Sequence, residues 1–166
     1  MVVAGLCAEA ARAVLAAIPD PEIPVVSITE LGIVRDVSVD GGSVEVTITP
    51  TYSGCPAMHA IEEDVVARLL EAGFADVKVR TALAPAWSTD WIAPEARERL
   101  RAYGIVPPHA VAGADTHRLH LFSRNVACPR CASANTERIS EFGSTACKAI
   151  YRCLDCREPF DYFKPL

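Results

Sequence analysis

Residues 32–49 read Gly-Ile-Val-Arg-Asp-Val-Ser-Val-Asp-Gly-Gly-Ser-Val-Glu-Val-Thr-Ile-Thr, and this stretch indicates the fold class. Apolar and polar residues alternate on both sides of Asp40-Gly41-Gly42, which predicts strands at 32–39 and 43–49. Glycine reaches positive φ with little strain, so the Asp-Gly-Gly triplet favours a tight turn. The sequence therefore predicts a β-hairpin in the first half of the chain.

Helical patterns lie on both sides of this hairpin. Residues 5–18 and 57–72 predict helices, and Pro56 suits the first position of the second one. The apolar stripe of the first helix is expected to contain Leu6, Ala10, Val14 and Ile18. The stripe of the second is expected to contain Ile61, Val65 and Leu69. A strand at 76–83 and a helix at 94–102 follow, so we expect an α+β fold with a small mixed sheet and helices.

The C-terminal region carries two Cys-x-x-Cys motifs. Cys128-Pro-Arg-Cys131 and Cys153-Leu-Asp-Cys156 are separated by 21 residues. Two such turns can place four thiolates at the corners of a tetrahedron, the geometry of structural zinc, although iron takes the same ligands. We favour zinc, because a short tail needs a metal to stabilise its fold. The tail is thus predicted to be a β-rich, zinc-ribbon-like domain.

A further cysteine, Cys147, lies close to the second motif. We expect it to be a small buried residue of the ribbon, because cysteine is among the most buried residue types. Substitution for one of the four ligands is the alternative.

Composition and charge exclude several classes of protein. The chain has 166 residues, 51% of them hydrophobic, a net charge of −5 and seven cysteines. Residues 1–110 hold 8 Lys and Arg against 15 Asp and Glu, and residues 111–166 hold 8 against 6. Such a balance disfavours nucleic-acid binding by either half. Without a membrane-spanning run or a basic leader we expect a cytoplasmic protein, where paired cysteines indicate a metal rather than disulfides.

The predicted elements divide the chain into three parts. We expect a first domain at 1–104, a connector at 105–125 with a strand at Arg118–Phe122, and the four-cysteine domain at 126–166. The histidines of the connector are expected at the surface, and they are His109, His117 and His120.

Cys55 is the second candidate for chemistry, because it directly precedes a helix that begins with proline. The N–H groups and dipole of a helix N-terminus stabilise a thiolate. His59 follows four residues later, and the loop with Asp20 and Glu22 offers oxygen ligands if the fold brings it near. The alternatives stay open: Cys55 can equally be buried, His59 a surface residue and Asp20 a turn residue.

Four segments, taken in order, resemble a known domain. They are Asp20-Pro-Glu-Ile-Pro24, Leu31-Gly-Ile33, Thr49 to Cys55-Pro56, and Pro85-Ala-Trp-Ser88. Over about residues 8–103 the chain resembles the SufT-like domain associated with metal–sulfur cluster assembly. Two segments of the tail, Glu141–Lys148 and Glu158–Phe163, resemble the extension of the PaaD (PaaJ) family from the phenylacetate-degradation operon.

This resemblance implies a site and a role. It implies that Cys55 is the reactive residue, that Asp20 and Glu22 form the acidic loop, and that Thr49 and Thr51 belong to the motif before the cysteine. It also implies transient binding of iron or an iron–sulfur cluster at Cys55. The implied role is that of an accessory or maturation factor for the multicomponent phenylacetyl-CoA monooxygenase (epoxidase), acting on its iron–sulfur cluster or diiron centre.

Several interpretations of the function follow. In the first, the chain works on the oxygenase and iron–sulfur reductase components of the epoxidase. In the second, it is a structural or electron-transfer subunit of that complex, and in the third its ribbon binds nucleic acid, which the charge disfavours. The sequence shows no Ser/His/Asp set and no phosphate-binding glycine loop, so we expect no independent catalysis. It leaves a homodimer open.

Overall fold

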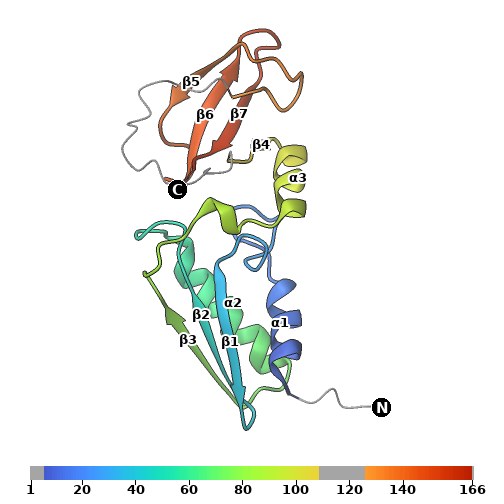
Figure 1. Cartoon of the computed structure of the whole chain (residues 1–166), viewed down its shortest axis with the longest axis vertical. Helices are drawn as coiled ribbons and strands as arrows, with labels where there is room; N and C mark the ends of the chain where they lie inside the picture. The colour runs from blue at the N-terminus through green and yellow to red at the C-terminus, as the bar shows by residue number, and fades with distance from the viewer. Residues whose placement is uncertain (1–5, 109–125, 166) are drawn as a thin grey trace. The chain divides into compact units, whose positions relative to one another are not determined.

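The structure, a computed structural model, describes residues 6–108 and 126–165. The chain divides into two compact units, Met1–Ala96 and Arg97–Leu166, each with a sheet of its own (Figure 1). The fold is α+β, as the sequence predicts. The domain limits expected from the sequence stay a prediction. The strand expected at Arg118–Phe122 and the histidines His109, His117 and His120 lie outside the described residues.

The N-terminal sheet has the order β1-β2-β3. It consists of β1 (Val34–Asp40), β2 (Ser43–Ile48) and β3 (Asp76–Thr81). β1 runs antiparallel to β2, and Asp40 pairs with Ser43 across the turn, where Gly41 and Gly42 have φ values of 55° and 89°. The predicted hairpin is therefore confirmed, with two glycines in the conformation that suits them. β3 runs parallel to β2, so the sheet is mixed.

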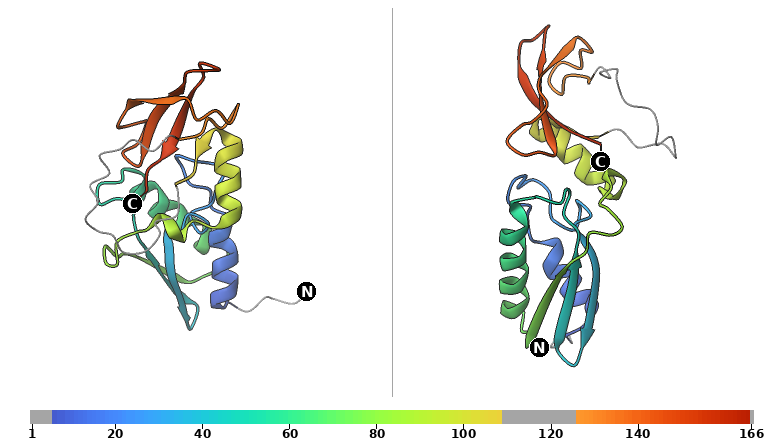
Figure 2. Two further views of the ribbon diagram at one scale, coloured as in Figure 1. Left: turned by 45° about the horizontal axis from the view of Figure 1, so that its top comes forward. Right: turned by 90° about the vertical axis from the view of Figure 1, so that its left-hand side faces the viewer.

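Two helices, α1 (Ala8–Ala16) and α2 (Ala57–Glu71), cover one face of this sheet (Figure 2). α2 connects the parallel strands β2 and β3, as a crossover helix does. It buries the three residues predicted for its stripe, Ile61, Val65 and Leu69. The core beneath the helices is completed by Val37, Val44, Val46 and Ile48 of the strands.

The predicted stripe of α1 is wrong. The helix buries Ala11 and Leu15, and Ile18 is buried just beyond its end, whereas Leu6 precedes the helix and is 41% exposed. The physical reason is the helical repeat of 3.6 residues. Steps of four along the chain drift around the helix, whereas the spacing 11, 15 and 18 stays on one face.

Three loops leave the N-terminal sheet at the same end. Ile48 pairs with Val34 of β1 and with Thr81 of β3. The segments before β1, after β2 and after β3 therefore begin side by side, as Figure 1 shows. Two hydrogen bonds tie them together: the Thr49 amide donates to the Ile33 carbonyl at 2.8 Å, and the Trp87 indole donates to the Leu31 carbonyl at 2.9 Å.

Gly32 lies where the first and third of these loops touch. Its φ is +73°, and a Cβ at this position would lie 2.6 Å from the Cβ of Trp91. Trp91 ends the short helix η1 (Thr89–Trp91), and the guanidinium of Arg35 lies 3.4 Å from the centre of its ring. The contact requires a residue without a side chain.

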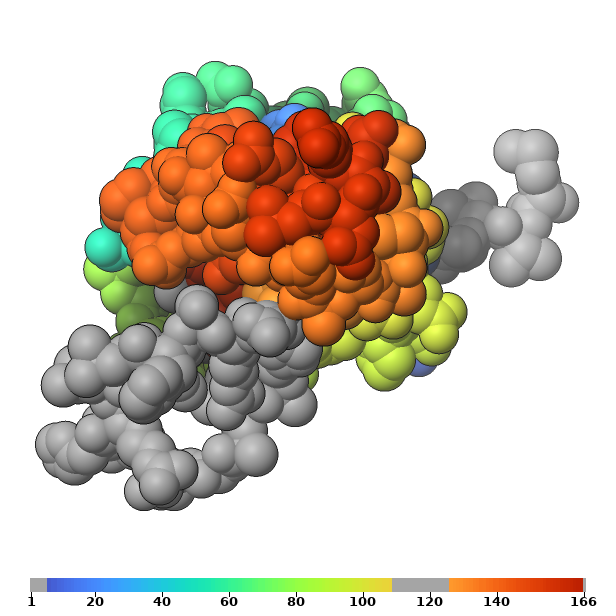
Figure 3. Space-filling view, turned by 90° about the horizontal axis from the view of Figure 1, so that it is seen from above, coloured from blue at the N-terminus to red at the C-terminus, as the bar shows by residue number. Residues whose placement is uncertain are grey.

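The C-terminal unit is a four-stranded sheet of order β4-β7-β6-β5, and it contains most of α3 (Pro94–Tyr103). Its strands are β4 (Ile105–Val106), β5 (Thr136–Ser140), β6 (Lys148–Cys153) and β7 (Pro159–Phe163). β5, β6 and β7 pair antiparallel, and β4 pairs parallel to β7. Figure 3 shows the surface that these residues form, in orange to red.

A small aromatic core holds this second sheet. The ring of Tyr151 lies 5.9 Å from that of Phe160 and 5.6 Å, edge to face, from that of Tyr162. Cys128 and Cys153 are buried in the same cluster. The core therefore reaches the cysteines, and the predicted β-rich tail is confirmed. None of the helices in residues 6–108 and 126–165 is long and apolar enough to span a bilayer.

Replacing Gly32 by alanine should destabilise the N-terminal unit by about 2–4 kcal/mol, because both the backbone conformation and the contact with Trp91 become unfavourable. Gly41→Ala is the matched control, since Gly41 has φ +55° but nothing within 4 Å of its Cβ position. It should lose only about 1–2 kcal/mol. Urea unfolding followed by tryptophan fluorescence measures both, because both tryptophans of the chain lie in this unit. Equal losses would contradict the close contact.

Candidate metal centre

The two Cys-x-x-Cys motifs meet in the C-terminal unit. Their four sulfur atoms lie within 4.8 Å of one another and form a group able to hold a metal ion. The Sγ atoms of Cys128 and Cys156 are 3.7 Å apart, and those of Cys131 and Cys153 are 3.6 Å apart. A disulfide would bring two sulfur atoms to about 2.05 Å, so these are free thiols. The fold thus brings together the four residues that the sequence predicts as ligands.

The spacing fits one tetrahedral ion. Four sulfur atoms at about 2.3 Å from a central ion lie about 3.8 Å from one another. The measured distances of 3.6 and 3.7 Å agree with this value. An iron–sulfur cluster places several iron atoms between its ligands, so its cysteine sulfurs have to be farther apart. The donor set therefore suits a single ion such as zinc.

Each motif forms the same tight turn, which we call a knuckle: residues 128–133 and 153–158. The amide of Cys128 donates to the carbonyl of Ser133 at 2.9 Å, and that of Cys153 donates to the carbonyl of Glu158 at 3.0 Å. The residue after the last cysteine of each motif has positive φ, 60° for Ala132 and 64° for Arg157. Neither is glycine, so the residue types do not signal this conformation.

The thiols influence one another's protonation. Hydrogen bonds from the backbone of Cys156, and then of Asp155, lower the pKa of Cys153 to about 7. For Cys156 the backbone of Glu158 acts to lower the pKa, but burial and the three neighbouring thiols outweigh it and raise the pKa to about 12. Four crowded thiols therefore do not all ionise by themselves, and a cation is what would let them do so.

Sequence reasoning missed three residues beside this centre. The carboxylate of Asp155 accepts hydrogen bonds from the side chains of Ser133 and Asn135, and these bonds lower the pKa of Asp155. Asp155 stands between the two cysteines of its own knuckle, and this position is the signal that could have drawn attention to it.

Cys147 lies outside the group of four thiols. It is buried, and its Sγ is 3.0 Å from the hydroxyl of Thr145. The four-sulfur group among the described residues is complete without it. Its role as a substitute ligand therefore has no support from the geometry, while its burial agrees with the expectation of a small residue inside the ribbon.

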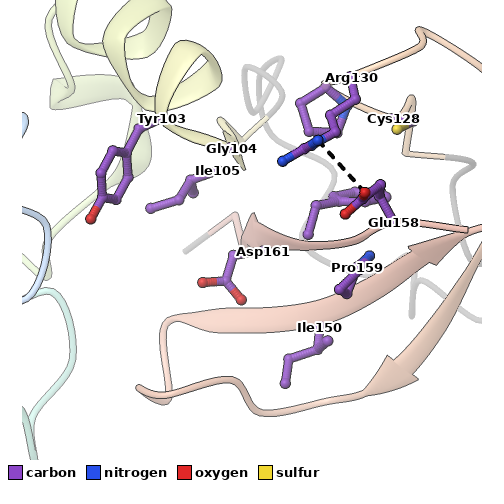
Figure 4. Close-up of a pocket in the computed structure, with 11 residues that line it drawn as sticks. Tyr103, Gly104, Ile105, Cys128, Arg130, Ile150, Glu158, Pro159 and Asp161 are labelled. Carbon is purple, nitrogen blue, oxygen red and sulfur yellow. Dashed lines mark ion pairs between the residues drawn. The ribbon is translucent and has the colours of Figure 1, made fainter. Parts of the chain in front are cut away.

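An open depression of about 450 Å³ adjoins the first knuckle (Figure 4). Ile105, Ile150 and Phe160 contribute apolar walls. Its charged groups are engaged within the protein: Arg130 lies 3.6 Å from Glu158, and Asp161 lies 3.5 Å from the buried Lys148. The depression therefore offers no group that would select a particular ligand.

Cys55 lies at the loop end of the N-terminal sheet. Its amide donates to the carbonyl of Tyr52 at 3.1 Å, and its carbonyl accepts from the amide of Met58 at 3.3 Å. It thus occupies the turn that leads into α2, and it is half-buried. This position suits a thiol that is stabilised by a helix N-terminus and still accessible.

The acidic loop lies at the same end of the sheet, because it precedes β1. The Oδ1 atom of Asp20 accepts hydrogen bonds from the amides of Glu22 and Ile23, at 2.9 and 2.8 Å, and Asp20 is 6% exposed. Asp20 therefore shapes the turn, which is one of the two interpretations that the sequence left open, while Glu22 is half-buried.

The remaining predicted site residues differ in their surroundings. Thr49 is buried and bonded to the strand before it, and Thr51 is half-buried in the same loop. The imidazole of His59 is 81% exposed and lies 3.3 Å from Glu63, one turn along α2. His59 is thus a surface residue of the helix, and the roles suggested for all these residues stay predictions.

Metal affinity of the four-cysteine centre should fall by at least about tenfold for each pH unit between pH 8 and pH 6, because binding displaces protons from the thiols. The sign follows from the pKa of Cys156, which near 12 keeps this thiol protonated until a metal replaces its proton. Competition with a chelator of known affinity, at several pH values, measures the slope. An affinity that does not change with pH would contradict binding by these thiols.

Comparison with known proteins assigns both units to families. Residues 8–85 match the family described as "Iron-sulfur cluster assembly protein", and residues 112–164 match the "PaaD zinc beta ribbon domain". A crystal structure described as "Domain of Unknown Function DUF59 from Bacillus anthracis" is 31% identical, covers 56% of this chain and 90% of its own, and has a TM-score of 0.52.

Two curated relatives carry functional names. One, from Porphyromonas gingivalis (strain ATCC BAA-308 / W83), is named "Fe-S protein maturation auxiliary factor" and is 39% identical over 46% of this chain and 74% of its own. The other, from Escherichia coli (strain K12), is named as a subunit of "Putative 1,2-phenylacetyl-CoA epoxidase" and is 57% identical over 92% of this chain and 89% of its own. With an iron–sulfur cluster assembly domain followed by a zinc ribbon of the PaaD type, the chain belongs to the PaaD family of phenylacetyl-CoA epoxidase subunits.

Proposed function

We propose that this chain is an accessory factor that helps to load the iron–sulfur cluster or the diiron centre of a phenylacetyl-CoA epoxidase. One observation carries the proposal: the fold gathers the acidic loop, the segment from Thr49 to Cys55 and the segment after β3 at a single end of the N-terminal sheet. A half-buried thiol at a helix N-terminus, close in the topology to carboxylates, suits transient binding of iron.

The four-cysteine centre has a different task in this proposal. Its sulfur atoms are spaced for one tetrahedral ion, and all four ligands come from the protein, which is the arrangement of a structural zinc site. The ion would stabilise the fold of the C-terminal unit, whose core is small. Metal that is handed on would be held at Cys55, where the thiol does not belong to a closed set.

The expected partners are the oxygenase and the iron–sulfur reductase components of the epoxidase. The printed name of the relative from Escherichia coli supports an association with that enzyme. The name of the relative from Porphyromonas gingivalis supports a maturation role. We infer that the chain acts on these components in the cytoplasm and that it has no catalysis of its own.

A second candidate is a permanent subunit that transfers electrons through the four-cysteine centre, since one relative is named as a subunit. Zinc has no redox chemistry, so this role requires iron in the centre. Visible absorbance of anaerobically purified protein separates the two: a colourless protein with one zinc excludes electron transfer there, whereas iron–thiolate absorbance favours it.

The ribbon charges weigh against nucleic-acid binding. Arg130, Arg138, Lys148 and Arg152 each lie within an ion pair with a carboxylate of the same unit. Binding to phosphates would have to compete with these pairs.

Cys55→Ser should prevent full iron loading of the client while leaving the metal content of the chain's own tail unchanged, because serine lacks the thiolate that binds iron. The oxygenase and reductase components are produced together with each variant, and their iron content and activity are measured. Cys7→Ser is the matched control, since Cys7 is an exposed cysteine just before α1. Clients that reach full iron content with Cys55→Ser would refute the proposal.

A further inference from the structure

The two knuckles are related by a repeated pattern of contacts. Ser133 and Glu158 each lie two positions after the last cysteine of their own knuckle, and each accepts the amide of the first cysteine. Arg130 and Asp155 also correspond, since each stands directly before the last cysteine. The two halves of the centre thus use equivalent positions.

Each of these inner residues reaches across to the opposite knuckle. Nη1 of Arg130 lies 3.6 Å from Oε1 of Glu158, as the dashed line in Figure 4 marks. In the other direction, the hydroxyl of Ser133 donates to Oδ2 of Asp155. The contacts are therefore reciprocal, and both connect one pair of cysteines to the other.

The arm of Asp155 has more bonds than that of Arg130. Its Oδ1 accepts a hydrogen bond from Nδ2 of Asn135 at 2.7 Å, so both carboxylate oxygens are engaged. The carbonyl of Asn135 in turn accepts from the amide of Leu154 at 2.8 Å, and its amide donates to the hydroxyl of Ser133 at 3.0 Å. The Arg130 side chain is 69% exposed, and such ion pairs are weak.

We propose that these contacts form a clasp, made of Arg130 with Glu158 and of Asp155 with Ser133 and Asn135, which retains the metal in the four-cysteine centre. Each knuckle supplies two of the four thiols, so an ion leaves only when the knuckles separate. The clasp opposes that separation without touching the metal. The ion is then a resident part of the protein and not a cargo for the client.

This inference rests on the metal loading proposed above for the tail. It gives the two cysteine sites separate tasks, because a retained ion cannot serve the transfer assigned to Cys55. Residues that orient metal ligands commonly change metal affinity by about 10- to 100-fold when they are replaced. The clasp residues are positioning residues of this kind.

The test is the rate at which the zinc-loaded full chain releases its metal to an excess of a chromogenic chelator. Asp155→Ala should release it at least about tenfold faster, and Arg130→Gln should show a smaller increase. Glu141→Gln is the control, because its ion pair with Arg138 lies outside the knuckles. It should release zinc at the wild-type rate. The spectrum of the Co²⁺-substituted protein reports whether each variant keeps four thiolates around the ion.

A second pair of variants guards against general loss of folding. Asp155→Asn keeps one acceptor oxygen and should be intermediate in rate, and Ser133→Asp combined with Asp155→Ser restores a bond in the reverse direction and should slow the release again. The clasp is refuted if Asp155→Ala releases zinc at the wild-type rate, or if the reversed pair is as fast as Asp155→Ala. A wild-type chain that binds no metal would refute the proposed centre itself, which is a distinguishable result.

Discussion

The register of β2 with both of its neighbours is the constraint on which the N-terminal unit depends. Ile48 pairs with Val34 on one side and Thr81 on the other, so three chain segments leave the sheet at one end. A shift of one residue would turn the buried face of β2, with Val44, Val46 and Ile48, toward solvent. The same pairing that buries the core therefore also assembles the loops around Cys55.

A second constraint governs the C-terminal unit, where four thiols share a small volume. They lie close enough for one ion, and their mutual influence keeps Cys156 protonated when no cation neutralises the set. The aromatic cluster around Tyr151 supplies only a small core. Metal binding and folding are thus coupled, and contacts between the knuckles, such as that of Asp155 with Asn135, hold the ligands in register.

The two cysteine sites differ in the way that their proposed tasks require. Cys128 and Cys153 are buried in the ribbon core, and all four thiols of the centre face one another. Cys55 instead lies alone on a loop before α2 and is half-buried. A closed set retains its ion, whereas a single accessible thiolate can bind and release one. The family relationship and the geometry therefore support the same division of labour.

Residue type and spacing alone establish the α+β class, the hairpin at Asp40–Gly42, the buried stripe of α2 and the identity of the four thiols, because a periodic pattern records each of these. The stripe of α1 failed because neighbouring apolar residues allow several faces, and packing against β1 and α2 selects one. Three-dimensional packing, in contrast, determines which end of the sheet gathers the loops, that Asp20 is used in shaping its turn, and how the knuckles hold each other. Hydrogen bonds and ion pairs between distant segments, such as that of Ser133 with Asp155, depend on strand register and on packing, and neither is written in the spacing of residues along the chain.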